Sequence, residues 1–312
     1  MIARKSSPAE TVNNKKLGQA ASTAGLAQLR RLEWRVKHVA DSIISGEYRS
    51  AFRGRGREFD QVVRYQFGDD VRDIDWNVTA RLGEPYRKSF IEEREVTLVL
   101  LMEDSVSLQF GSGAVSKREA LTEMAGLLSL VCSANRDRLA IINATHGSHW
   151  FLPPQRGHRG IRQAAAKLLS SPPPEISTIN PIEIPWKFIL RTIPRHSILI
   201  WLGDFPPRVK PECWPAFRRK FQVMGFRIDD PWERKLPDLG AINAYDPSSG
   251  EMVVLDTSSA AHRREHARWN EQREKSWEHF FPNSLNRLSF QAGDSCLHAL
   301  LKFFQARERR LR

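Results

Sequence analysis

The sequence predicts an α/β protein with a doubly wound, mostly parallel sheet. Three apolar runs, at 96–102, 137–144 and 196–202, are too short for typical helices and have the continuous apolar character of strands buried on both faces. Stretches with helical periodicity lie between them, among them 117–135 and 160–171. Strands that alternate with helices favour right-handed βαβ crossovers, which place the strands parallel and cover both faces of the sheet.

The other elements follow the same periodicities. At the N-terminal end, leucine and valine recur at three- and four-residue steps, which predicts a helix over 24–48, and the glycine-rich, charged segment after it favours a small sheet or an ordered loop insert. Later segments predict a short strand at 148–152, a helix at 214–225, a strand beginning at 226, a hairpin strand at 251–256, and helices at 260–281 and 295–310.

These elements divide the chain into four parts. Residues 1–25 are rich in Ser, Thr, Asn, Ala and Lys and are expected to form a disordered basic lead-in. Residues 26–95 hold the N-terminal helix and the charged segment, and 96–260 hold the α/β domain. Residues 261–312 are expected to form helices packed on that domain.

Charge and composition restrict the function. The formal charge is +12, with twelve Lys/Arg against four Asp/Glu in residues 1–57 and six against eleven in 58–103. The basic arm leaves open an electrostatic nucleic-acid binder, although the regularly interleaved aromatics of a single-strand binder are missing. The three cysteines lack metal-site spacing, no apolar run could span a membrane, and no signal peptide is evident, so we expect a cytoplasmic protein.

One charged segment contains four aspartates within seven positions: Asp69, Asp70, Asp73 and Asp75. Arg64, Arg72 and Arg81 lie close by in sequence, which favours ion pairs and hydrogen bonds to backbone amides, and Gly68 favours a turn. We therefore interpret the cluster as structural scaffold. A partner-docking surface and a metal-dependent hydrolase that uses these carboxylates remain as alternatives.

A second candidate site lies after the predicted strands. Parallel sheets bind ligands in the loops beyond the carboxyl ends of their strands. Glu103, Ser105 and Ser107 follow the first apolar run at alternate positions, and Asp204 follows the run at 196–202. A carboxylate and two hydroxyls in such a turn supply the oxygen ligands that Mg²⁺ takes.

The charged segment and the pieces around it resemble a bacterial family, domain of unknown function 58. The resemblance covers residues 45–305 and includes "EDSVSLQFGS", "DRLAII" and "LGDF". The positions that match the family in the charged segment are Gly54, Gly56, Glu58, Phe59, Arg64, Tyr65, Gly68, Asp69, Asp70, Arg72, Ile74, Asp75, Trp76, Ala80 and Arg81.

That family is similar to von Willebrand factor A domains, Rossmann-like folds with a metal-ion-dependent adhesion site. The resemblance implies a non-enzymatic interaction module, a protein partner of the MoxR-type AAA+ ATPase class or its client, and a Mg²⁺ or Mn²⁺ site at Glu103, Ser105, Ser107 and Asp204. The adhesion motif is Asp-x-Ser-x-Ser, and this chain has Glu103 in place of the aspartate. The threonine that usually completes the site has no evident counterpart.

Overall fold

The computed structural model describes residues 23–34, 48, 59–90, 95–175, 182–246 and 251–311. Residues 23–34 are helical, so the predicted N-terminal helix begins within the last residues of the predicted lead-in. The rest of that helix, most of the lead-in, and Gly54, Gly56 and Glu58 lie outside the described residues. None of the helices in the described ranges is long and apolar enough to cross a membrane.

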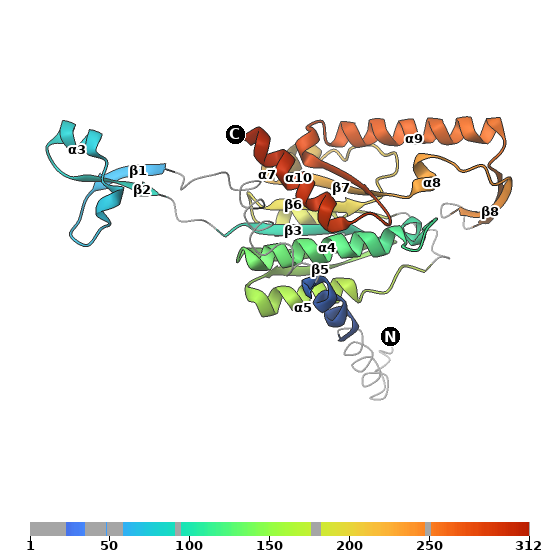
Figure 1. Ribbon diagram of the computed structural model, residues 1–312, viewed down its shortest axis with the longest axis horizontal. Helices are drawn as coiled ribbons and strands as arrows, with labels where there is room; N and C mark the ends of the chain where they lie inside the picture. The colour runs from blue at the N-terminus through green and yellow to red at the C-terminus, as the bar shows by residue number, and fades with distance from the viewer. Residues whose placement is uncertain are drawn as a thin grey trace, which may run out of the picture.

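Six strands form one sheet in the order β10-β7-β6-β3-β4-β5 (Figure 1). All neighbouring pairs are parallel except β4 and β5, which are antiparallel and joined at Gly147 in a left-handed conformation (φ 71°). The predicted α/β fold is therefore confirmed. The strands are β3 (Thr97–Glu103), β4 (Arg138–Thr145), β5 (Ser148–Gln155), β6 (Ile198–Gly203), β7 (Gln222–Asp229) and β10 (Arg287–Gln291).

Helices cover both faces of this sheet. Every residue of β3 and β6 is buried, and alternate side chains enter two separate apolar clusters because successive strand residues point to opposite faces. One cluster packs against α4 (Lys117–Ala134), α5 (Gly157–Leu169) and α10 (Cys296–Leu311). The other packs against α6 (Trp186–Thr192), α7 (Trp214–Lys220) and α9 (Ala260–Phe280).

Three parts of the chain differ from the sequence-based expectation. The helix predicted at 214–225 ends at Lys220 as α7, and the strand predicted to begin at 226 begins at Gln222 as β7. Only helices are predicted after residue 260, yet β10 lies there and extends the sheet beside β7. Its five residues are too few, and too evenly mixed in polarity, for periodicity to reveal a strand. The predicted hairpin strand is β9 (Glu251–Asp256), which pairs with β8 (Ala241–Asp246) in a separate two-stranded sheet.

The charged N-terminal segment forms a small unit with its own sheet. Of the two predicted alternatives, a small sheet or an ordered loop insert, the structure shows the sheet. Strands β1 (Phe59–Arg64) and β2 (Tyr86–Phe90) are antiparallel, and the 3₁₀ turn η1 (Val71–Asp73) and helix α3 (Trp76–Leu82) lie between them in sequence. Gly83 ends α3 with a left-handed φ of 74°, where a side chain would be strained. Residues 49–58 and 91–94, on either side of the unit, lie outside the described residues.

Candidate functional site

The candidate site lies at the carboxyl ends of three adjacent strands. β3 ends at Glu103, Asp204 follows β6, and β7 ends at Asp229. Parallel strands bring their carboxyl ends to the same edge, so acidic residues that are distant in sequence meet there. The structure therefore brings the predicted residues of the first and second loops into one region.

Glu103 points away from the two serines for a reason that strand geometry explains. Val99 and Leu101 of β3 face the cluster of α6, α7 and α9, and Glu103 continues that alternation. Its carboxylate accepts a hydrogen bond from Trp201 Nε1 at 3.0 Å and pairs with Arg208 at 2.7 Å. Burial raises the pKa of Glu103, although Arg208 opposes the rise.

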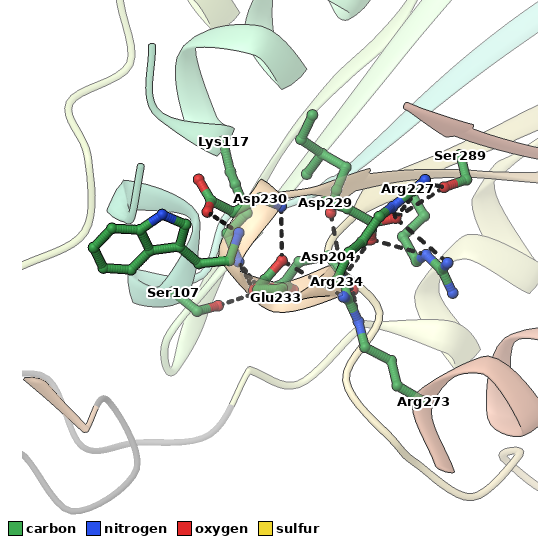
Figure 2. Close-up of polar contacts among 12 residues, drawn as sticks. Ser107, Lys117, Asp204, Arg227, Asp229, Asp230, Glu233, Arg234, Arg273 and Ser289 are labelled. Carbon is green, nitrogen blue, oxygen red and sulfur yellow. Dashed lines mark hydrogen bonds and ion pairs between the residues drawn. The ribbon is translucent and has the colours of Figure 1, made fainter. Parts of the chain in front are cut away.

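Ser105, Ser107 and Asp204 do meet. The two hydroxyl oxygens are 2.7 Å apart. Ser107 Oγ donates to Asp204 Oδ2 at 2.5 Å (Figure 2). The same Oδ2 atom lies 3.3 Å from the ammonium of Lys117, which begins α4. Of the predicted ligands, Asp204 thus contacts a lysine that was not predicted to belong to the site, and the two serines reach Asp204 through hydroxyl hydrogen bonds.

Lys117 is held between two carboxylates. Its ammonium lies 2.5 Å from Glu233 Oε1, on the short helix α8 (Pro231–Arg234), and its side chain is 1% exposed. Burial alone would lower the pKa of Lys117, but Asp204 and Glu233 outweigh that effect and raise it. Burial would likewise raise the pKa of Asp204, and Lys117 and Ser107 reverse the direction. Both groups are therefore charged at neutral pH.

A second ion cluster adjoins the first and fixes α9 to the strand ends. Arg273 is 2% exposed; it ion-pairs with Asp229 at 2.9 Å and donates to the backbone oxygen of Asp204 at 2.9 Å (Figure 2). Arg227 and Arg234 also pair with Asp229, at 3.0 and 2.9 Å. Burial tends to raise the pKa of Asp229, but Arg273 and Arg227 lower it below its ordinary value.

Two further carboxylates, of Asp104 and Asp230, hold the loops after β3 and β7 in place. Asp104 is fully buried and binds Arg118 through two hydrogen bonds, at 2.7 and 2.8 Å. Asp230 accepts from the backbone amide of Ser112 at 2.8 Å, which joins the loop after β3 to the loop after β7.

Sequence reasoning missed Lys117, Arg208, Glu233 and Arg273 as members of this region. One signal was available: "DDPWER", 229–234, places two aspartates and a capping box directly at a strand end.

These residues do not fit a divalent cation as they are arranged. Mg²⁺ requires about six oxygen ligands at roughly 2.1 Å, usually including carboxylates. Glu103 is bound to Trp201 and Arg208, while Asp204 Oδ2 is shared by Ser107 and Lys117. Asp204 Oδ1 is the one buried carboxylate oxygen of this set without a hydrogen-bond partner. Within the described residues, no group of three or more His, Cys, Asp or Glu side chains could hold a metal.

Comparison with known proteins identifies the family to which the chain belongs. Residues 61–276 match the family model described as protein of unknown function DUF58. The chain belongs to this family. It is similar to the uncharacterized protein Mb1516 of Mycobacterium bovis and to the uncharacterized protein Rv1480 of Mycobacterium tuberculosis. Each is 28% identical over an alignment of 258 residues, and the match covers 78% of this chain and 80% of the relative.

The DUF58 match includes the aspartate cluster, and the structure shows how these carboxylates are engaged. Asp69 pairs with Arg87 at 2.7 Å and accepts from the amide of Gln66 at 2.9 Å. Asp70 pairs with Arg72 at 2.9 Å. Asp75 caps α3 by accepting from two backbone amides and lies 3.7 Å from Lys88.

The partners differ in part from those predicted for the cluster. Arg72 serves Asp70 as expected, but Arg64 pairs with Glu84, and strand β2 supplies Arg87 and Lys88 instead. Arg81 lies exposed in the last turn of α3. Tyr65 donates its hydroxyl to the backbone of Asp69, and Trp76 is 68% exposed. Carboxylates used as caps and in ion pairs favour the scaffold interpretation.

Proposed function

We propose that this DUF58 protein is a non-enzymatic interaction module that binds a protein partner through the loops after β3, β6 and β7. The observation that carries the proposal is an apolar rim on these loops. Val209 is 90% exposed, Phe110 is 43% exposed and Val115 is 36% exposed. Phe110 also contacts Trp232 of the third loop, with ring centroids 6.4 Å apart. Exposed apolar side chains on loops that buried ion pairs hold in place suit a docking surface.

The charge states of the groups around Ser107 argue against catalysis. A serine nucleophile needs a base that can take its proton, and a lysine base must be neutral to do so. Here the pKa of Lys117 is raised and that of Asp204 is lowered, so neither group is tuned to accept a proton from Ser107 at neutral pH. Asp69, Asp70 and Asp75 of the N-terminal unit are paired with cations, which also argues against the hydrolase alternative.

For the partner, we propose a MoxR-type AAA+ ATPase or its client, in a von Willebrand A-like mode of binding in the cytoplasm. This step rests on the family resemblance, and the exposed loops supply a surface for it. Nucleic-acid binding gains no argument from the described residues, because the basic lead-in lies almost wholly outside them.

The test is a binding measurement with a purified MoxR-type ATPase from the same cell, with and without ATP. Val209→Asp should weaken binding at least about tenfold, because it places a charge in an apolar contact. Val253→Asp is the matched control, since Val253 lies on β9 and is 46% exposed. Equal losses in the two variants, or no binding by the unaltered chain, would refute the proposal.

A further inference from the structure

We propose that the Lys117 ammonium occupies the cation position of this site permanently, so that the domain functions without a divalent metal. We further propose that shortening Lys117 converts the same residues into a site for Mg²⁺ or Mn²⁺. Both statements concern the isolated chain and do not depend on the partner proposed above.

The two carboxylates that would bind a metal already contact the ammonium. Lys117 Nζ lies 2.5 Å from Glu233 Oε1 and 3.3 Å from Asp204 Oδ2. Ser107 Oγ donates to that same Oδ2 atom, and Ser105 Oγ lies 2.7 Å from Ser107 Oγ. Hydroxyl and carboxylate oxygens are the ligands that Mg²⁺ prefers. The ammonium therefore contacts both carboxylates of this set, and the two serine hydroxyls are hydrogen-bonded in series to one of them, Asp204.

The local charge disfavours a metal beside the ammonium. Asp204 and Glu233 both contact Lys117, and Arg273, whose closer ion pair is with Asp229 at 2.9 Å, lies a further 3.5 Å from Glu233. A dication beside Lys117 would bring three positive charges against the two carboxylates, before Arg273 is counted. Unbalanced buried charge is strongly unfavourable, so the metal could enter only if the ammonium left.

The fold holds the ammonium in place. Lys117 is the first residue of α4, whose start is fixed by a capping box between Ser116 and Glu119 and by a 3.0 Å backbone bond from Lys117 to Phe110. Its side chain is 1% exposed, so withdrawal would require the stem to leave a packed environment. A metal in solution cannot displace it by simple exchange.

Shortening the side chain changes this balance. Lys117→Ala removes one charge and opens space beside Asp204 Oδ2 and Glu233 Oε1. Asp204 Oδ1 has no hydrogen-bond partner in the part of the chain that the structure describes, and the hydroxyls of Ser107 and Ser105 are hydrogen-bonded in series to Oδ2. Two carboxylates would then be free to bind an ion, with two hydroxyls next to them. That set, completed by water, matches the way Mg²⁺ and Mn²⁺ are commonly bound.

The experiment is a Mn²⁺ titration of the chelator-treated full chain, followed by calorimetry and by thermal unfolding. The unaltered chain should show no site-specific binding up to about 1 mM Mn²⁺. Lys117→Ala should bind one Mn²⁺ and gain roughly 5 °C or more in Tm when the ion is near saturation. Adding Asp204→Asn to Lys117→Ala should abolish the gain, since it removes the central carboxylate.

Each other outcome overturns the proposal. Binding of Mn²⁺ to the unaltered chain that is lost on Ser107→Ala would show that a metal coexists with Lys117. If Lys117→Ala is folded but does not bind Mn²⁺, the lysine does not occupy the position of a metal ion. If Lys117→Ala is unfolded in chelator, recovery of native tryptophan fluorescence with Mn²⁺ supports the proposal, and failure to recover refutes it.

Discussion

Arg273 provides the sharpest test of the ion network, through the substitution Arg273→Met. The side chain is 2% exposed, and its guanidinium pairs with Asp229 at 2.9 Å and with Glu233 at 3.5 Å. It also donates to the backbone oxygens of Asp204 at 2.9 Å and Ile228 at 3.3 Å. Methionine retains most of the apolar stem while removing every one of these donors.

The expected cost follows from what the substitution leaves behind. Removing one partner of a buried ion pair costs about 3–5 kcal/mol, because the remaining charge stays buried without full compensation. Arg227 and Arg234 still face Asp229, which places the expectation in the lower half of that range. At about 2–4 °C per kcal/mol for a domain of this size, Tm should fall by roughly 6–16 °C.

Urea unfolding at pH 7, followed by tryptophan fluorescence, measures the free energy of unfolding. Arg268→Met on the same helix is the matched control, since Arg268 is exposed and should tolerate the change with little loss. A loss below about 1 kcal/mol for Arg273→Met would refute the view that Arg273 fixes α9 to the strand ends.

Three further outcomes are expected. Because burial raises the pKa of Glu103, its contribution to stability is present below its unfolded pKa and lost as pH rises through the folded value. The stability of Glu103→Gln, which can still accept from Trp201, should therefore increase relative to that of the unaltered chain as pH rises above the unfolded glutamate pKa of about 4.3 in urea titrations; a constant difference would contradict this. Gly225→Ala should lose about 1–3 kcal/mol in the same assay, because its Cβ would lie 2.5 Å from atoms of Trp277 and Phe281, and an unchanged midpoint would show that α9 can shift away. Asp75→Ala should cost α3 about 1 kcal/mol as a lost cap, seen as faster amide exchange confined to 76–82, whereas faster exchange in β3 as well would show that the unit is coupled to the sheet.

Much of the fold was predictable because it depends on local periodicity. Continuous apolar runs identified β3, β4 and β6, since a strand buried on both faces cannot contain polar residues at alternate positions. Strand β10 was not predicted, because a half-buried edge strand of five residues has no such pattern and is defined only by its pairing with β7.

The candidate site was predictable only in position. The sequence alone placed Glu103, Ser105, Ser107 and Asp204 after strands, and parallel-sheet geometry made their proximity an expectation. Which of them face one another was decided by tertiary structure. Strand alternation turns Glu103 to Trp201 and Arg208, and the packing of α4 delivers Lys117 to Asp204.

The aspartates of "RYQFGDDVRDIDWNVTAR", 64–81, show the same division. The pattern of residues around them resembles the family, and the arginines nearby predicted that cations would pair with them. Only the folded unit shows that Arg87 and Lys88 of β2 share that task, because contacts between a connecting segment and a strand cannot be read from linear distance. The sequence thus determined what this protein is, and the tertiary structure decided which charges meet, because electrostatic pairing depends on distances of a few ångströms that only packing sets.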